Sequence, residues 1–335
     1  MTEQYSEKQD FTRRRFIARN AKAALSIAAA GAVAYSMYDR KGPRIQTDSK
    51  TLVSLPEFSA TRIDGKSLCI VKGSDRVKTV NKALELLGGI ERFIRPGDTV
   101  LIKPNVAFAT PAILGATADP ELIGQVVRLC FNRGQAKQVL VTDNPINDPV
   151  SCFQLSGIGK AATEAGAKVV MPKPHLFRLT TLEAGRLIRN WPILYGPFEK
   201  ADKVIGISPV KDHHRSGASM TMKNWYGTLG GRRNIFHQDI NTIISEVATM
   251  VRPTFVILDG TQVMMTNGPT GGSLADLRKA NTMIVSTDMT AADSFGASLL
   301  DLSVTDLPYL AKGQAAGVGV TDYKKLKPIF AEVND

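Results

Sequence analysis

The chain has 335 residues, of which 43% are hydrophobic and 22% charged, and its formal net charge is +11. This is an ordinary soluble composition, with enough apolar residues for the core of one large or two modest α/β domains. The basic balance suits anionic ligands. No arginine-rich stripe with interleaved aromatic residues is present, so a nucleic acid is not expected as a partner.

Residues 1–34 carry the pattern of a twin-arginine export signal. The sequence TRRRFI at residues 12–17 has a small polar residue, two arginines and two apolar residues in the typical order, and a weakly apolar run follows at residues 21–34. A membrane anchor is the alternative, but spanning needs about 20 apolar residues. Ala32-Val33-Ala34 is a candidate cleavage site. We predict export by the twin-arginine machinery to the periplasm, with a membrane tether if the signal stays uncleaved.

The predicted export route also bears on cofactors, because it carries proteins that are already folded, often with a cofactor inserted. It therefore favours a metal or redox cofactor. The three cysteines, Cys69, Cys130 and Cys152, have no C-x-x-C spacing. An iron–sulfur cluster usually needs four thiolates, so no such cluster is expected from this chain alone. Cys69 and Cys130 lie in apolar runs typical of a core, and one disulfide remains an option.

Residues 35–65 are polar and broken by Gly and Pro, which indicates a flexible tether before a single domain at residues 66–335. Strand and helix patterns alternate in that domain and predict an α/β fold with a mostly parallel sheet and helices on both faces. Asp119 and Asp239 are candidate helix N-caps. Strands are predicted at residues 67–73, 98–106, 138–145, 168–172, 203–211, 254–264 and 281–288, and helices at residues 75–90, 119–134, 157–167, 239–251 and 289–302. Residues 177–198 are the least regular and are expected to form a small insertion.

Polar side chains follow most of the predicted strands, and the carboxyl ends of parallel strands are where open sheets bind ligands. A ligand crevice is therefore predicted there. Any one of these polar residues could instead cap a helix or form a turn. Helix caps and turns do not explain why two lysines lie at strand ends that face the same crevice. The strand ends are Lys103-Pro104-Asn105, Asp143-Asn144, Lys211-Asp212-His213-His214, Asp259-Gly260 and Thr287-Asp288.

The segment at residues 210–239 holds three of the four histidines and the glycine-rich sequence GTLGGRRN. Such a loop can hold a carboxylate or phosphate through backbone N–H groups and guanidinium groups, here of Arg232 and Arg233. Six residues are predicted to bind an anionic small molecule: Lys103, Asn105, Lys211, Lys223, Asn224 and Arg232.

The histidines also suggest a metal site. One of His213 and His214, together with His237 and a carboxylate from Asp212, Asp143 or Asp259, would suit mononuclear Fe, Mn or Zn. Alternatively, the histidines only hydrogen-bond loop carbonyls. Neighbouring side chains of an extended backbone face opposite ways, so only one of His213 and His214 is expected to face the crevice. The predicted catalytic residues are His214, His237, Asp143 and Asp259.

Several blocks together resemble the domain-of-unknown-function family 362. They are VLIKPNV, VLVTDNP, RPTFVILDGTQVMMTNGPTGG, IVSTDMTAAD and the segment from Lys211 to His237, and they extend in matching order from about Leu68 to Leu300. The resemblance implies an α/β domain that occurs in bacteria and archaea and is sometimes joined to ferredoxin-like iron–sulfur modules. This sequence lacks that cysteine-rich module, so an electron-transfer role would require a separate iron–sulfur or redox protein.

These observations leave three functions open. The first is an exported enzyme, metal-dependent or redox-associated, that acts on a small anionic molecule, with redox chemistry slightly favoured over hydrolysis. The second is a non-catalytic accessory or binding protein that delivers a cofactor or ligand to an exported redox enzyme. The third, a purely structural periplasmic protein, does not explain the polar strand ends.

Overall fold

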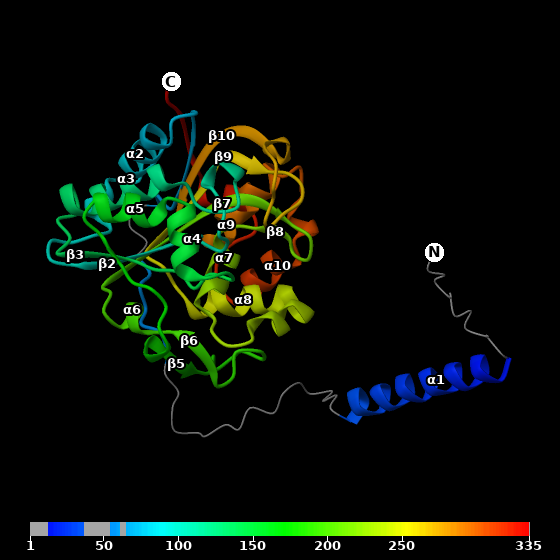
Figure 1. The fold of residues 1–335 in the computed structure, drawn as a ribbon. Helices are drawn as coiled ribbons and strands as arrows, with labels where there is room; N and C mark the ends of the chain where they lie inside the picture. Colours follow the sequence, from blue (N-terminus) through cyan, green and yellow to red (C-terminus); the bar gives the residue numbers. More distant parts are fainter. Residues whose placement is uncertain (1–12, 37–53, 61–64, 335) are drawn as a thin grey trace, which may run out of the picture. The chain divides into compact units, whose positions relative to one another are not determined.

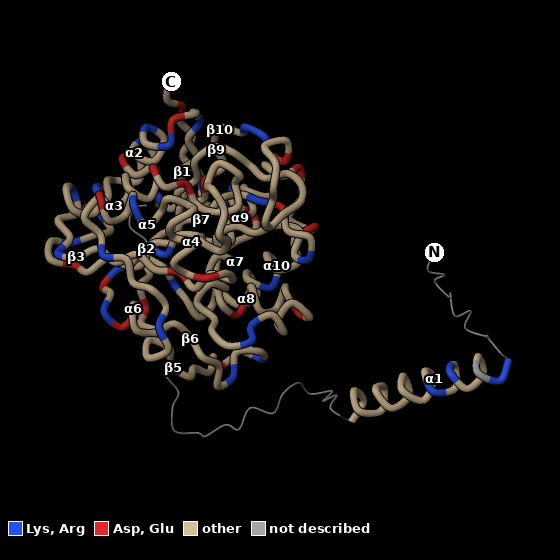
Figure 2. The backbone as a smooth tube through the Cα atoms, in the orientation of Figure 1, with Lys and Arg blue, Asp and Glu red and all other residues tan. Residues whose placement is uncertain are grey.

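The computed structural model describes residues 13–36, 54–60 and 65–334, and it divides the chain into a unit up to Gln46 and a unit from Thr47 onward. In the first unit, α1 (Arg13–Ser36) covers the apolar run of the predicted signal, and its basic residues lie in its N-terminal half (Figure 2). Thr12, where the twin-arginine pattern begins, lies outside the described residues. None of the described helices is long and apolar enough to cross a membrane.

The second unit is built on a mixed sheet that has nine strands within the described residues (Figure 1). Eight strands follow the order β11-β1-β10-β9-β7-β2-β3-β4, and β8 pairs with β7 alone. The strands are β1 (Leu68–Lys72), β2 (Thr99–Pro104), β3 (Gln138–Val141), β4 (Lys168–Val169), β7 (Lys203–His213), β8 (Gly217–Ser219), β9 (Phe255–Met264), β10 (Leu277–Ser286) and β11 (Ile329–Glu332).

The predicted mostly parallel order is confirmed, with one consequential exception. The neighbours β9, β7, β2, β3 and β4 all run parallel. In contrast, β10 is antiparallel to both β9 and β1. The carboxyl end of β10 therefore lies at the opposite edge of the sheet from the other strand ends. Asp288, which follows β10, caps α9 (Met289–Ser298) there through a bond from Ala291 N, so its expected place at the crevice was wrong.

Helices cover both faces of this sheet. Alternate strand residues such as Ile102, Ile205 and Ile257 share one core with α2 (Arg76–Leu86), α3 (Pro120–Asn132) and α5 (Ile158–Glu164). The residues between them, such as Leu101 and Val256, point to the other face. They are buried as well, because α7 (Thr221–Asn224), α8 (Ile240–Met250), α9 and α10 (Pro308–Ala315) lie on that side (Figure 1). Burial on both faces explains the near-continuous apolar runs of the strands.

Side-chain caps start several of the helices at the positions that the sequence indicates. Asp119 accepts hydrogen bonds from Glu121 N and Leu122 N, with Pro120 at the first helical position of α3. Asp239 likewise accepts from Thr242 N and starts α8. A cap of this kind stabilises a helix by about 1 kcal/mol. The helix α4 (Pro149–Leu155), which the sequence did not predict, is capped by Asp148.

Two regions differ from the expectations. Residues 177–198 form an ordered two-stranded antiparallel sheet of β5 (Phe177–Thr180) and β6 (Trp191–Leu194), followed by the short α6 (Gly196–Glu199). The folded body also begins before residue 66, since Leu55 and Phe58 are buried and the ring of Phe58 lies 6.2 Å from that of Phe198. The tether predicted at residues 35–65 was therefore too long. A few apolar residues within a polar segment are enough to pack part of it against the domain. All three cysteines are free and buried.

Candidate functional site

A hollow lies where the sequence places the crevice, at the carboxyl ends of β2, β3 and β7. Its volume is about 540 Å³. Its walls come from the segments that follow β2 and β3, from β7, from α7, and from the two 3₁₀ helices Trp225–Thr228 and Arg233–Asp239. We call it the basic pocket, because four cationic side chains line it: Lys211, Arg215, Lys223 and Arg233.

A buried ion pair forms the floor of the basic pocket. Lys103 Nζ lies 2.7 Å from Asp143 Oδ1, and both side chains are almost fully buried. The other oxygen of Asp143 accepts a hydrogen bond from Val106 N at 2.8 Å. Burial lowers the pKa of Lys103, and the carboxylate of Asp143 opposes that shift. Asp143 therefore serves mainly to neutralise Lys103 and to fix the turn after β2.

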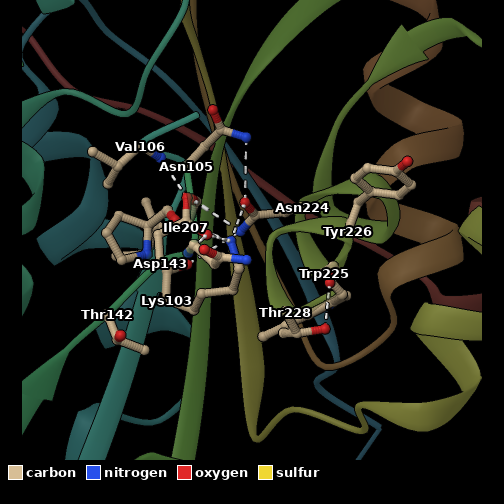
Figure 3. A network of polar contacts seen from close by, with 12 residues as sticks. Lys103, Asn105, Val106, Thr142, Asp143, Ile207, Asn224, Trp225, Tyr226 and Thr228 are labelled. Atoms are coloured by element: carbon tan, nitrogen blue, oxygen red, sulfur yellow. Dashed lines mark hydrogen bonds and ion pairs between the residues drawn. The ribbon is translucent and has the colours of Figure 1, made fainter. Parts of the chain in front are cut away.

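Asn224 ties this floor to α7. Its Oδ1 accepts from Lys103 Nζ at 3.0 Å and from Asn105 Nδ2 at 3.3 Å, while its Nδ2 donates to the carbonyls of Lys103 and Ile207. Figure 3 shows these side chains pointing toward one another between the strands and the helix. A buried amide with every group bonded holds its neighbours in one arrangement. Asn224 thus fixes the helix that carries Lys223.

Gly227 permits this close packing. A Cβ at this position would overlap Asp143 Oδ1 and lie 2.8 Å from Lys103 Nζ. No side chain fits there without displacing the ion pair. The glycine of the sequence GTLGG thus allows a close approach to the floor of the pocket.

Lys211 and Lys223 differ in how they are held. Lys211 Nζ donates to Asn105 Oδ1 at 3.2 Å and to the carbonyl of Ala116. Burial, together with the charge of Lys223, lowers the pKa of Lys211 to about 7. Lys223 Nζ has no hydrogen-bond or ion-pair partner among the described residues and lies 5.1 Å from the centre of the Tyr226 ring. Burial and the charge of Arg233 lower its pKa to about 7.

Three histidines stack in a row beside these amines. The ring of His213 lies between the rings of His214, at 5.1 Å, and His237, at 6.1 Å, with small interplanar angles. All three line the basic pocket, whereas only one of His213 and His214 was expected there. The expectation of opposite faces failed because β7 ends at His213, so the extended backbone does not continue through His214.

Backbone contacts assign the proton of each ring. His213 Nδ1 accepts hydrogen bonds from Arg215 N and Ser216 N, so the proton is on Nε2. His214 Nδ1 faces the carbonyl of Gly268 at 3.3 Å, and His237 Nδ1 faces the carbonyl of Asn234 at 3.3 Å. Both rings are therefore assigned a proton on Nδ1, so that in the neutral tautomer Nε2 has the lone pair.

The protonation of His213 and His237 follows from their surroundings. Burial, with the nearby charge of Lys223, lowers the pKa of His213 to about 2, so this ring is neutral at physiological pH. The same two causes lower the pKa of His237. His213 can donate a hydrogen bond from Nε2, whereas His214 and His237 can accept a proton there.

Arg233 rather than Arg232 supplies the guanidinium of the basic pocket. Arg233 is buried and donates to the carbonyls of Leu229 and Tyr226. Arg232 is exposed and lines a neighbouring hollow of about 260 Å³. The sequence named both arginines of the pair, but only the fold separates the buried one from the exposed one.

Two predicted carboxylates lie outside the basic pocket. Asp259 is in the middle of β9 instead of at its end, and it bonds to Arg76 Nε at 2.7 Å. Asp212 alternates away from Lys211 along β7 and accepts from Gly268 N at 3.0 Å. The placement of both residues at the crevice was therefore wrong. Asp259 lies inside β9, whose predicted range of residues 254–264 already continued past it, and Asp212 lies inside β7, which ends at His213.

The predicted metal-ligand set is not assembled among the described residues, where no group of three or more His, Cys, Asp or Glu is arranged to hold an ion. His213 cannot be a ligand in its present tautomer, because its Nδ1 faces two N–H donors while Nε2 carries the proton. A metal-bound histidine instead donates from the nitrogen that does not bind the metal. His214 and His237 satisfy that requirement, but the three candidate carboxylates, Asp143, Asp212 and Asp259, are held by other groups.

Several pocket residues were not predicted from the sequence. They are aromatic, apolar or exposed side chains that carry no ligand-like signal by themselves, and the chain fold alone brings them to the pocket. The main ones are Phe108, Ile146, Arg215 and Tyr226. Of the predicted residues, Asn105, Asp143, Lys211, His213, His214, Lys223, Asn224 and His237 line the pocket together.

The fold and site define an α/β protein with a cation-lined, histidine-containing pocket at the carboxyl ends of parallel strands. The chain belongs to the family described as Domain of unknown function (DUF362), which matches residues 100–298. That range contains every residue that lines the basic pocket.

Individual proteins resemble the chain more distantly. A thylakoid-associated protein of Synechocystis sp., sll1697, is 25% identical over 251 residues, covering 71% of this chain and 74% of that protein. The lactate racemase apoprotein from Thermoanaerobacterium thermosaccharolyticum matches at a TM-score of 0.36 with 13% identity, covering 73% of this chain and 61% of that one. A crystal structure of a Thermotoga maritima protein matches at a TM-score of 0.40 with 13% identity, covering 67% of this chain and 59% of that one. The chain thus spans less than two thirds of either solved protein, and we assign neither protein's activity to it.

Proposed function

We propose that the chain is an enzyme that holds a small organic anion in the basic pocket and transfers a proton with one of its histidines. This proposal rests on the excess of cationic over anionic side chains in the pocket. Four cationic side chains line it, and Asp143, the one carboxylate among the described lining residues, is neutralised by Lys103. Two of the four cations, Lys211 and Arg233, are buried, and buried positive charge is costly unless an anionic ligand compensates it.

The rest of the lining favours an organic anion over an inorganic one. Phe108, Ile146, Pro269 and the ring of Tyr226 form apolar wall beside the cations. Pockets for small organic ligands combine an apolar lining with a few polar groups that fix orientation. A carboxylate on a short carbon skeleton would satisfy both parts of this lining.

The histidines supply proton transfer to such a ligand. Nε2 of His214 or His237 has a free lone pair and can act as a general base, and His213 Nε2–H can donate to an oxygen that gains negative charge. A neutral histidine held by backbone donors is suited to the second role, since its protonation state does not change near neutral pH. Asp143 acts indirectly, by holding Lys103 and the floor of the pocket.

A mononuclear Fe, Mn or Zn ion remains a separate prediction. His214 and His237 could provide two ligands, and a bound ion would supply Lewis-acid or redox chemistry. The residues present do not complete a two-histidine, one-carboxylate set, so no step of the proposed mechanism depends on a metal. A separate iron–sulfur or redox partner likewise remains a prediction from the resemblance.

The proposal also includes export by the twin-arginine route, which rests on the sequence of residues 12–34. Conservative replacement of both arginines, Arg13→Lys with Arg14→Lys, should keep the protein in the cytoplasm. Fractionation of cells that express the full chain would test this. Equal periplasmic amounts of wild type and double variant would contradict the export proposal without affecting the pocket.

The enzymatic part can be tested with a panel of small hydroxy and oxo acids in D₂O. We expect at least one acid to raise the melting temperature and to exchange a carbon-bound proton for deuterium, as followed by proton NMR. The double variant His214→Gln with His237→Gln should abolish exchange while binding remains, and Lys160→Met, at an exposed position, is the matched control. Binding without exchange by the wild type would favour the accessory-protein alternative, and the absence of any binding would reject the anion pocket.

A further inference from the structure

Lys223 is half-buried and differs from the buried cations of the site in having no hydrogen-bond or ion-pair partner among the described residues. Lys103 is paired with Asp143, Lys211 donates to Asn105 and Ala116, and Arg233 donates to two backbone carbonyls. For Lys223 Nζ, the contact found within the described residues is the face of the Tyr226 ring. An amine held by the ring face alone keeps its N–H groups and its lone pair available to a ligand.

The position of Lys223 in the chain is nevertheless rigid. It lies in α7, whose first two backbone N–H groups donate to the buried carboxyl of Asp293 at 2.8 and 3.0 Å. The next residue, Asn224, is bonded on all sides to β2 and β7. The backbone of Lys223 is thus fixed from both directions while its amine is left free, as a reacting group requires.

The surroundings of the amine favour its neutral form. Burial and the charge of Arg233 lower its pKa to about 7, so about half of the molecules carry a neutral amine at neutral pH. Lysines desolvated beside another cation are activated as nucleophiles toward carbonyl groups. The same pocket contains the groups that such chemistry needs: cations for a neighbouring carboxylate, a donor at His213 Nε2 and an acceptor at His237 Nε2.

We propose that Lys223 is a covalent catalytic residue that forms a Schiff base with the carbonyl group of a small 2-oxo acid. The proposal rests on the proposed function and names its substrate class. Nζ attacks the carbonyl carbon, a C–N bond forms, and the carbonyl oxygen takes up a proton to give a carbinolamine. The carbinolamine then loses its hydroxyl group as water while C=N forms and nitrogen loses a proton, so an amine and a ketone become an imine and water. No oxidant or reductant is needed.

The Schiff base would explain why basic histidines lie beside an amine. A protonated imine withdraws electrons from the adjacent carbon and makes its C–H acidic. His237 or His214 can accept that proton at Nε2, which gives a stabilised carbanion equivalent. Lys211 and Arg233 would hold the carboxylate of the oxo acid at the same time.

Reductive trapping tests this inference. The full-length protein is incubated with pyruvate, oxaloacetate or 2-oxoglutarate and sodium borohydride, and the adduct is located by peptide mass spectrometry. We expect one reduced adduct per chain, on the peptide that contains Lys223, for at least one acid. Lys223→Arg should lose the adduct and keep the fold, while Lys160→Arg, at an exposed lysine, should label like the wild type.

The outcomes separate this inference from the proposed function. An acid that raises the melting temperature of the wild type but leaves no adduct on Lys223 would overturn the Schiff base and keep the anion pocket. Adducts spread evenly over surface lysines, unchanged in Lys223→Arg, would also overturn it. If no oxo acid binds and none is trapped, but malonate or phosphate binds, the Schiff base fails and the pocket stands. If no anion of any kind binds, both proposals fail.

Discussion

Lys103 and Asp143 form a buried ion pair, 2.7 Å between Nζ and Oδ1, at the floor of the basic pocket. Removing one partner of such a pair leaves an uncompensated charge and costs about 3–5 kcal/mol, whereas apolar replacement of both is often neutral. We therefore expect Asp143→Asn to lower the free energy of unfolding by about that amount. Urea denaturation would measure it.

The double variant Lys103→Met with Asp143→Leu supplies the control. It should recover a large part of the stability lost in Asp143→Asn, because neither charge then remains. If the double variant loses as much as the sum of the two single variants, the pair is not coupled as described. Lys160→Ala, in an exposed pair with Glu164, should change stability little.

The half-buried amine of Lys223 predicts a pH dependence of stability. Its pKa is about 7 in the folded protein, against about 10.4 for an unfolded lysine, so the unfolded chain binds more protons between these values. Stability should then rise with pH across this window, by up to about 1.4 kcal/mol per pH unit, and fall as pH drops through about 7. Lys223→Met removes this contribution.

Denaturation of both proteins between pH 6.5 and 9.5 would measure the effect of Lys223, including its influence on the pKa of the neighbouring Lys211. The unfolding free energy of the wild type, minus that of Lys223→Met, should increase as the pH rises. A difference that stays constant over this range would mean that Lys223 has an ordinary pKa in the folded state.

Asp293 offers a test of how α7 is held. Its carboxyl accepts from Thr221 N, Thr221 Oγ1 and Met222 N, and burial raises its pKa to about 7. Asp293→Ala leaves those donors without partners, each at a cost of about 1–3 kcal/mol. It should therefore destabilise the protein and also weaken anion binding, because α7 carries Lys223. Asp322→Ala, which removes the cap of the exposed turn at Tyr323–Leu326, should leave binding unchanged.

The tautomer of His213 can be observed directly. Long-range ¹H–¹⁵N spectra should show one ring with the proton on Nε2 that does not titrate between pH 5 and 8, since the pKa of His213 is about 2. That signal should be missing in His213→Asn. A ring that takes up a proton near pH 6, or that carries its proton on Nδ1, would contradict the assignment from Arg215 N and Ser216 N.

The sequence predicted much of the fold because its strands carry long apolar runs and its helices begin at Asp caps such as Asp119 and Asp239. It could not predict the direction of β10, since antiparallel and parallel buried strands have the same apolar pattern. That single reversal moved Asp288 away from the crevice. The strand predicted at residues 254–264 already continued past Asp259, as β9 does, so the placement of Asp259 at the crevice came from treating polar residues inside a long strand as its end.

Part of the site was predictable for a related reason. Lys103, Asp143 and Lys211 lie near the ends of parallel neighbours, which necessarily meet at one edge of the sheet. The sequence alone cannot show that Arg233 and not Arg232 faces the pocket. It also cannot show that the ring of Tyr226 lies beside Lys223, because both facts depend on the three-dimensional path of the loops. The tautomers of the histidines depend on single backbone N–H groups and carbonyls, which no residue pattern reveals.

The most direct test of the account is the reactivity of Lys223 as a function of pH. Competitive acetylation of the full chain with isotopically labelled acetic anhydride, measured peptide by peptide, gives an apparent pKa for each lysine. The midpoint of each pH profile does not depend on how accessible the lysine is to the reagent. We predict a midpoint near pH 7 for Lys223, well below that of the peptide carrying Lys160, and protection of Lys223 by a bound oxo acid. A midpoint for Lys223 as high as that for Lys160 would contradict the central claim that the pocket holds an unpaired amine with a lowered pKa.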